Sequence, residues 1–107
     1  MHNAAQQLLS DARDRLRGAQ QRRDGLLSAI NGLFRRRAEL DAIRVRKQLV
    51  KEGTAAVIDE LRRTREVWER KSELLLATNQ VLAGLLGEVE AAEKAMSAVP
   101  AKPSLPD

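Results

Sequence analysis

The side chains that usually carry out catalysis or bind metal ions are few in this sequence. Its 107 residues include no cysteine and one histidine, His2. Glu66 and Glu69, like Glu90 and Glu93, are three residues apart among basic residues, which is typical of surface ion pairs on helices. No glycine-rich segment ends in Gly-Lys-Ser/Thr, as a phosphate-binding loop would. We therefore expect a protein that is not an enzyme and that holds no metal and no other cofactor.

Basic side chains are concentrated in the middle of the chain, where they could bind a polyanion. Residues 35–71 contain 12 basic and 7 acidic side chains, a net charge of +5, whereas the whole chain has +4. Phosphate groups of a nucleic acid would be the natural ligands. The candidates are Arg35, Arg36, Arg37, Arg44, Arg46, Lys47, Arg62 and Arg63. Acidic residues lie between them and aromatic residues are scarce, so a solvated helical surface is the favoured interpretation.

Three glycines lie one heptad apart inside a segment that otherwise favours a helix. Each costs about 1 kcal/mol relative to alanine in a helix interior. The same flank of the second half of the chain presents three apolar residues, also one heptad apart. A thin flank beside an apolar stripe predicts a groove for another helix. The groove residues are Gly18, Gly25 and Gly32 in the first half, and Val67, Leu74 and Val81 in the second.

A second apolar ridge, on the opposite flank, contains Leu27 and Phe34, with Leu86 in the second half. Two helices alone cannot bury apolar faces this wide, so we expect pairing with a second copy or with another protein. Two alternatives remain for the glycines. They could be tolerated on a solvent face, or Asn31-Gly32 could break the first helix and leave three helices, over residues 4–30, 33–51 and 54–98.

The elements that must position these residues are long helices. The chain is 32% charged and 2% aromatic, which is typical of coiled coils and unlike a sheet protein. Apolar residues recur at 4-3 spacing in both halves. We predict an all-α fold, a long antiparallel hairpin with helices over about residues 4–51 and 54–98. Its seam contains Leu16, Leu26, Leu33, Leu40, Trp68, Leu75, Leu82 and Val89.

The turn between the two helices is predicted at residues 52–54. Gly53 suits the left-handed position after a helix end, and Thr54 suits the cap of the next helix. Residues 99–107 contain three prolines and are predicted to form a flexible tail, because proline lacks the amide donor that a helix needs. The domain prediction is thus a hairpin over residues 1–98 and a tail over residues 99–107.

Folding the chain at this turn predicts a register for the hairpin. The pairs expected to face each other are Leu40 with Trp68, Leu33 with Leu75, Leu26 with Leu82, Ala19 with Val89, Leu16 with Ala92 and Ala12 with Met96. The same register places three arginines opposite three glutamates, namely Arg13, Arg15 and Arg17 opposite Glu88, Glu90 and Glu93. Ion pairs there would favour this register over a slipped one.

Two seam positions are unusual. Arg37 and Lys71 are expected to face each other, and either their long side chains bend outwards or a partner's acidic residue neutralises them. Trp68 is expected to fill the core, with its indole N–H reaching a polar neighbour. The alternative is a half-exposed anchor for a partner.

These observations favour a non-enzymatic interaction module, such as an assembly subunit, adaptor or chaperone, that acts by helix packing. The alternative is a small basic protein that binds nucleic acid. No motif assigns the chain to a family. We see no secretory signal, and the longest uncharged run, residues 74–87, is shorter than the about 20 residues that span a bilayer. We expect a cytoplasmic protein, with a nuclear location left open.

Overall fold

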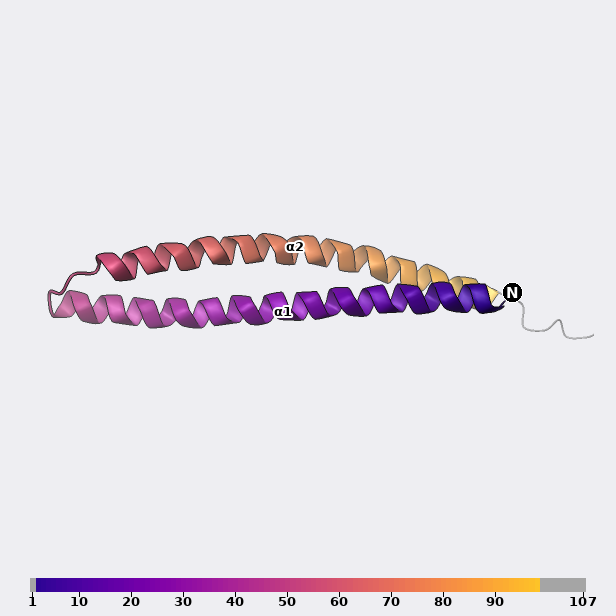
Figure 1. The fold of residues 1–107 in the computed structure, drawn as a ribbon, viewed down its shortest axis with the longest axis horizontal. Coiled ribbons are helices and arrows are strands. Elements are labelled where there is room, and N and C mark those ends of the chain that lie inside the picture. The colour runs from indigo at the N-terminus through magenta and orange to yellow at the C-terminus, as the bar shows by residue number, and fades with distance from the viewer. Residues whose placement is uncertain (1, 99–107) are drawn as a thin grey trace, which may run out of the picture. The chain divides into compact units, whose positions relative to one another are not determined.

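The computed structural model describes residues 2–98 and contains two long helices, α1 (His2–Leu49) and α2 (Ala55–Ala98), shown in Figure 1. No strand occurs in this part of the chain. The predicted all-α hairpin is confirmed. The expected tail at residues 99–107 lies outside the described residues. Helix α1 runs without interruption through Asn31-Gly32, so the three-helix alternative is wrong. Burial of Ile30 and half-burial of Leu33 on either side offset the cost of a mid-helix glycine.

The chain divides into two compact units, which are described separately. Unit 1 comprises the described residues of Met1–Arg22 and Thr78–Asp107, and unit 2 comprises Arg23–Ala77. Unit 2 contains the turn. In each unit a segment of α1 packs against a segment of α2, and the two segments run in opposite directions.

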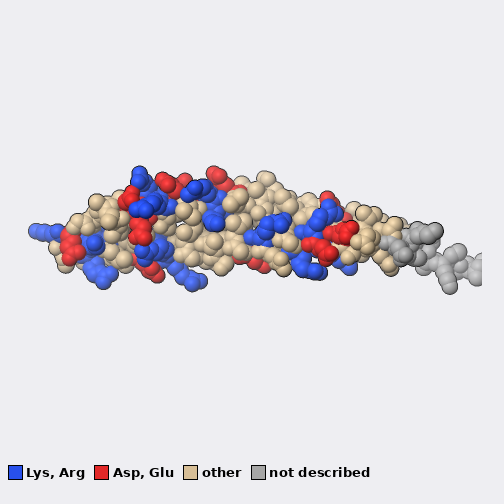
Figure 2. Space-filling view, in the orientation of Figure 1, with Lys and Arg blue, Asp and Glu red and all other residues tan. Residues whose placement is uncertain are grey.

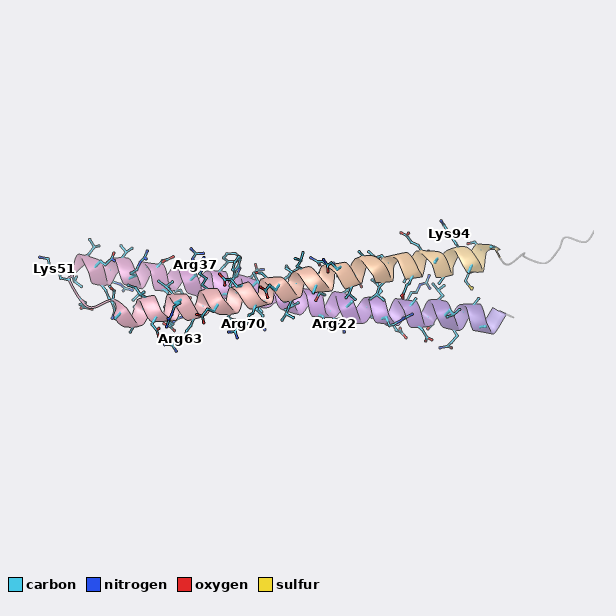
Figure 3. All side chains as sticks on the ribbon, turned by 90° about the horizontal axis from the view of Figure 1, so that it is seen from above. Arg22, Arg37, Lys51, Arg63, Arg70 and Lys94 are labelled. Atoms are coloured by element: carbon cyan, nitrogen blue, oxygen red, sulfur yellow. The ribbon has the colours of Figure 1, made fainter. Side chains whose placement is uncertain are left out.

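The turn closes the end of α1 with a Schellman motif. The Glu52 N–H donates to the Lys47 carbonyl oxygen at 2.8 Å, and the Lys51 N–H donates to the Gln48 carbonyl oxygen at 3.2 Å. Lys51 has a φ of 57° and projects at the turn in Figure 3. The prediction that Gly53 takes the left-handed position is therefore wrong, because the helix ends earlier and Lys51 adopts that conformation. Thr54 precedes α2 directly and so occupies the predicted cap position, where its carbonyl oxygen accepts the first helical bond from the Ile58 N–H at 2.9 Å.

The seam of unit 1 is closed by small residues. Leu9, Ala12 and Val89 form a buried cluster, and the half-buried residues packed against it are Leu16, Ala92 and Met96. Ala19, with 0% of its surface exposed, and Leu82 are buried too. Alanine at these positions lets two helices approach closely, because interhelical distance depends on side-chain size.

Ion pairs flank the seam of unit 1. Arg13 lies 3.7 Å from Glu93 and Arg15 lies 3.3 Å from Glu88, whereas Arg17 pairs with Asp14 on its own helix. Two of the three predicted arginines thus reach a predicted glutamate on α2. All four side chains of the interhelical pairs are more than half exposed, so each pair contributes at most about 1 kcal/mol.

The seam of unit 2 is less completely closed. Leu40 is the largest fully buried side chain, with 1% exposed, and Ile30 and Val57 are also buried. The seam residues predicted nearby are half-buried, namely Leu26, Leu33, Trp68 and Leu75. This unit therefore has a short buried core and a wider half-buried margin.

The predicted register is wrong in both units. In unit 1, Val89 clusters with Leu9 and Ala12, although Ala19 was its expected partner. A similar shift occurs in unit 2. The ring of Trp68 packs edge to face on Phe34, with centroids 6.0 Å apart, although Leu40 was its expected partner. A heptad pattern resembles itself after each shift of seven residues, so apolar residues still meet when one helix slides. Helix α1 ends at Leu49, two residues before its predicted end, and α2 begins at Ala55.

No helix in the described part of the chain has a stretch long and apolar enough to cross a membrane.

Candidate protein-interaction site

Among the described residues, more large apolar side chains are exposed to solvent than buried. Eleven large hydrophobic residues are exposed, whereas the buried core has eight residues, of which two are alanines. The exposed residues are Leu8, Leu27, Phe34, Val45, Leu49, Val50, Ile58, Leu74, Leu76, Val81 and Leu86. Single exposed leucines are normal, but repeated ones on a helix flank mark an interaction surface.

Five of the six apolar residues predicted to bind a partner are exposed. On the predicted ridge, Leu27 and Phe34 of unit 2 and Leu86 of unit 1 are between 41% and 50% exposed. On the predicted stripe, Leu74 of unit 2 and Val81 of unit 1 are at least half exposed, while Val67 is half-buried. A partner that covered these side chains would remove their apolar surface from water.

The three predicted groove glycines have open space around them. A Cβ atom at Gly25 or Gly32 would meet nothing within 4 Å, and one at Gly18 would meet an Arg22 side-chain nitrogen at 3.9 Å. In unit 1, Gly18 and Val81 line a shared hollow of about 450 Å³ with Leu85. No contact within either unit explains why these positions are glycine.

A hollow of about 520 Å³ lies between α1 and α2 in unit 2. Its walls combine apolar side chains with guanidinium groups. The lining residues are Leu33, Phe34, Arg37, Asp41 and Arg44 of α1, and Leu61, Arg62, Thr64, Arg65 and Trp68 of α2. We call it the arginine-rimmed hollow. Its volume falls within the range of about 300–1,000 Å³ that is usual for ligand sites.

Two lining residues of this hollow have buried donors without an acceptor, namely Nε1 of Trp68 and Nε of Arg44. The expectation that the indole N–H of Trp68 reaches a polar neighbour is therefore wrong. The ring itself is half-buried, between the predicted core role and the alternative anchor role. A buried donor without an acceptor costs about 1–3 kcal/mol.

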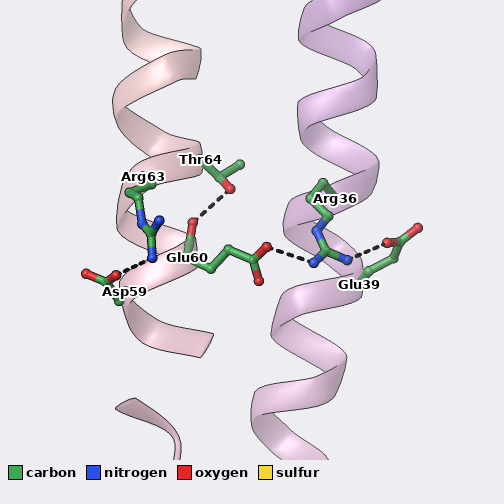
Figure 4. A network of polar contacts seen from close by, with 6 residues as sticks. All are labelled: Arg36, Glu39, Asp59, Glu60, Arg63 and Thr64. Carbon is green, nitrogen blue, oxygen red and sulfur yellow. Dashed lines mark hydrogen bonds and ion pairs between the residues drawn. The ribbon is translucent and has the colours of Figure 1, made fainter. Parts of the chain in front are cut away.

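The basic residues of unit 2 are largely held by carboxylates of the same unit. Figure 4 shows Arg36 donating to Glu60 across the helices, at 2.9 Å, and to Glu39 on its own helix, at 3.2 Å. The hydrogen bond to Glu60 is the largest of the causes that raise the pKa of Arg36. Arg63 and Arg62 both donate to Asp59 and lower the pKa of that carboxyl group. These pairs compete with any external anion.

The other residues predicted to bind a polyanion form fewer or longer ion pairs. Arg35, Arg46 and Lys47 form no ion pair with described residues, whereas Arg44 and Arg37 reach Asp41 at 3.4 Å and 3.9 Å. Figure 2 shows blue and red side chains interleaved on the visible face, without one continuous basic surface. A polyanion would therefore meet scattered cations beside carboxylates.

Arg37 and Lys71, which were expected to face each other on the seam, differ in their exposure. The Arg37 side chain is 67% exposed and extends towards Asp41, and Lys71 is half-buried. An outward bend of the arginine was one of the two alternatives, and the structure supports it for Arg37. The charge is thereby kept in water and its burial is avoided.

Several lining residues of the arginine-rimmed hollow were missed from the sequence, namely Asp41, Leu61, Thr64 and Arg65. The signal was present in the heptad spacing. Phe34 and Asp41 are seven residues apart, as are Leu61 and Trp68, so both pairs lie along one helix flank. The flanks could not be matched without the correct register.

No group of three metal-ligating side chains occurs among the described residues. Comparison with protein families, with curated proteins and with solved structures gave no match to this chain.

Proposed function

We propose that the chain is a non-enzymatic assembly module that acts by packing its exposed helix faces against another helix. The observation that carries this proposal is the excess of exposed large apolar side chains over buried ones. Burying apolar surface contributes about 25 cal/mol per Å², so covering the exposed ridge and stripe residues of unit 2, namely Leu27, Phe34 and Leu74, would stabilise a complex. Adaptor, chaperone and assembly subunit are the roles that this mode of binding fits.

The heptad spacing of both surfaces favours a helix as the partner. Leu27 and Phe34 are seven residues apart on α1, and Val67 and Leu74 are seven apart on α2. Each pair presents side chains at intervals of about 10.5 Å along one flank, the repeat with which another helix interlocks. A second copy of this chain and a different protein both satisfy this requirement.

The test is the molar mass in solution, by light scattering over a range of concentrations, with and without an uncharged amphipathic peptide of Leu, Ala and Gln. We expect a mass above 11.9 kDa for the chain alone or with the peptide. Leu74→Asp should abolish this increase. Leu76→Asp is the matched control, because Leu76 is also exposed, at 63% against 54% for Leu74, but lies about 200° away around the helix.

Two results would contradict the proposal. One is a mass of 11.9 kDa under every condition. The other is an equal effect of the Leu74 and Leu76 substitutions, because association would then not depend on the predicted face.

Polyanion binding is the second candidate, and the net charge of unit 2 supports it. Residues 23–77 carry 13 basic and 9 acidic side chains, a net charge of +4. Because Arg36 already pairs with Glu60, the informative variant is Arg35→Glu with Arg46→Glu, since neither arginine forms an ion pair within residues 2–98. Binding of DNA or heparin that this variant abolishes, and that added salt weakens steeply, would favour this function.

A further inference from the structure

Apolar walls, guanidinium groups and unsatisfied donors meet at one place in the molecule, the arginine-rimmed hollow of unit 2. We propose that this hollow docks an acidic amphipathic helix of another protein, which inserts an apolar side chain between Phe34, Leu61 and Trp68 and places carboxylates on the rim. The inference rests on the proposed function and names the partner's chemistry.

The walls require an apolar insert. Leu33, Phe34, Leu61 and Trp68 line the hollow, and Phe34 remains 50% exposed although it packs on Trp68. Leu27 extends the same flank of α1 by one heptad and is also exposed. An apolar surface that continues along the helix beyond the hollow suits a partner helix better than a small molecule.

The rim requires acceptors. Arg37, Arg44, Arg62 and Arg65 line the hollow, and a guanidinium group has five N–H donors and no acceptor. Each of the four already has one carboxylate partner, at Asp41, Asp59 or Glu69. All of these are local pairs on one helix, three or four residues apart, and leave further N–H groups on each guanidinium unused.

The two buried donors are an independent reason to expect a partner that carries hydrogen-bond acceptors. Nε1 of Trp68 and Nε of Arg44 have no acceptor, and protein atoms cover both. An incoming carboxylate can satisfy them only after the indole ring or the guanidinium group turns. Docking should therefore relieve the cost of an unsatisfied donor and change the surroundings of the Trp68 ring.

Charge distinguishes an acidic partner from a second copy. Unit 2 has a net charge of +4, whereas the described residues of unit 1 from Ala4 onwards carry five basic and five acidic side chains. Two copies joined through unit 2 would bring like charges together, and unit 1 offers no net negative charge. An acidic helix gains attraction at the same surface.

The experiment uses Trp68 as its reporter, because it is the single tryptophan and the chain has no tyrosine. The probe is a tryptophan-free peptide of three heptads, with Leu on one face and Glu on the flanks. Its control has Lys in place of every Glu. Titration of the full chain is followed by Trp68 emission and, independently, by calorimetry.

We expect the acidic peptide to shift the emission of Trp68 and to bind at least about tenfold more tightly than the basic one. Phe34→Ala, and Arg37→Gln with Arg65→Gln, should each weaken binding of the acidic peptide by about tenfold or more. Lys94→Gln removes an exposed cation of unit 1 and should leave the affinity unchanged. Circular dichroism checks that every variant keeps its helices.

Several outcomes would overturn the inference. These are equal binding of the two charged peptides, no binding of either, or no effect of the Arg37 and Arg65 substitutions. A dimer that Phe34→Ala dissociates would identify a second copy as the occupant, and heparin binding through Arg37 and Arg65 would identify a polyanion. Binding of the uncharged peptide without a charge preference would leave the proposed function standing and reject the inference alone.

Discussion

Unit 1 and unit 2 are built from opposite ends of the same two helices, but their seams differ. Unit 1 closes its seam with Ala12, Ala19 and Val89, and its described side chains carry no net charge. Unit 2 has Leu40 as its one fully buried large side chain, a hollow of about 520 Å³ against about 450 Å³ for the hollow at Gly18 in unit 1, and a net charge of +4. Residue size at the seam accounts for the difference in packing between the two units, because alanines allow close contact and aromatic rings hold helices apart. We therefore propose that unit 2, which has the larger hollow and the positive net charge, is the half that binds a partner.

The largest effect should come from the core of unit 2. Leu40→Ala removes the largest fully buried side chain, and we expect a loss of about 3 kcal/mol in the free energy of unfolding. Leu76→Ala, at an exposed position, should change it by less than about 0.5 kcal/mol. Urea unfolding at low protein concentration measures both. Equal losses would mean that Leu40 does not hold this unit together.

The close contact in unit 1 should not tolerate a larger residue. Ala19→Leu places three additional carbon atoms where no surface is exposed, and we expect a loss of about 1–3 kcal/mol in unfolding free energy. The control is Ala83→Leu at an exposed position of the same unit. Thermal unfolding followed by circular dichroism compares them. If Ala19→Leu is as stable as the wild type, unit 1 is not tightly closed.

The glycines should be unfavourable for the free chain. Gly25→Ala and Gly32→Ala meet no neighbour within 4 Å and should each raise the free energy of unfolding by up to about 1 kcal/mol. Gly84→Ala and Gly87→Ala are matched controls in unit 1 with equally open surroundings. If a partner uses the unit 2 glycines for close approach, alanine there weakens association, whereas the controls leave it unchanged. Equal effects on association in both pairs would remove the glycine flank from the interface.

The smallest effect should come from the ion pairs of unit 2. Hydrogen bonds from Arg63 and Arg62 lower the pKa of Asp59 in the folded chain below its ordinary value of 3.8. A carboxyl group of this kind contributes stability above pH 3.8, and the contribution disappears as pH falls through the folded-state pKa. Asp59→Asn should therefore lower the melting temperature slightly at neutral pH and not at strongly acidic pH. A difference that persists in acid would assign the effect to packing.

Composition and heptad spacing were sufficient to predict the two helices and the burial or half-burial of the seam residues. They could not determine the register, since Trp68 meets apolar residues in more than one alignment and contacts Phe34 in the structure. The helix end depended on Lys51 adopting a left-handed conformation that glycine adopts more readily, so Gly53 was a misleading signal. The arginine-rimmed hollow was missed because it depends on that register.

Hydrogen exchange followed by mass spectrometry tests most directly whether unit 2 is the half that binds. The full chain is compared alone and with the acidic amphipathic peptide. Our account predicts added protection of amides in residues 30–44 and 57–72, with little change in residues 7–20 and 80–95. Added protection confined to unit 1, or none in either unit, would contradict it.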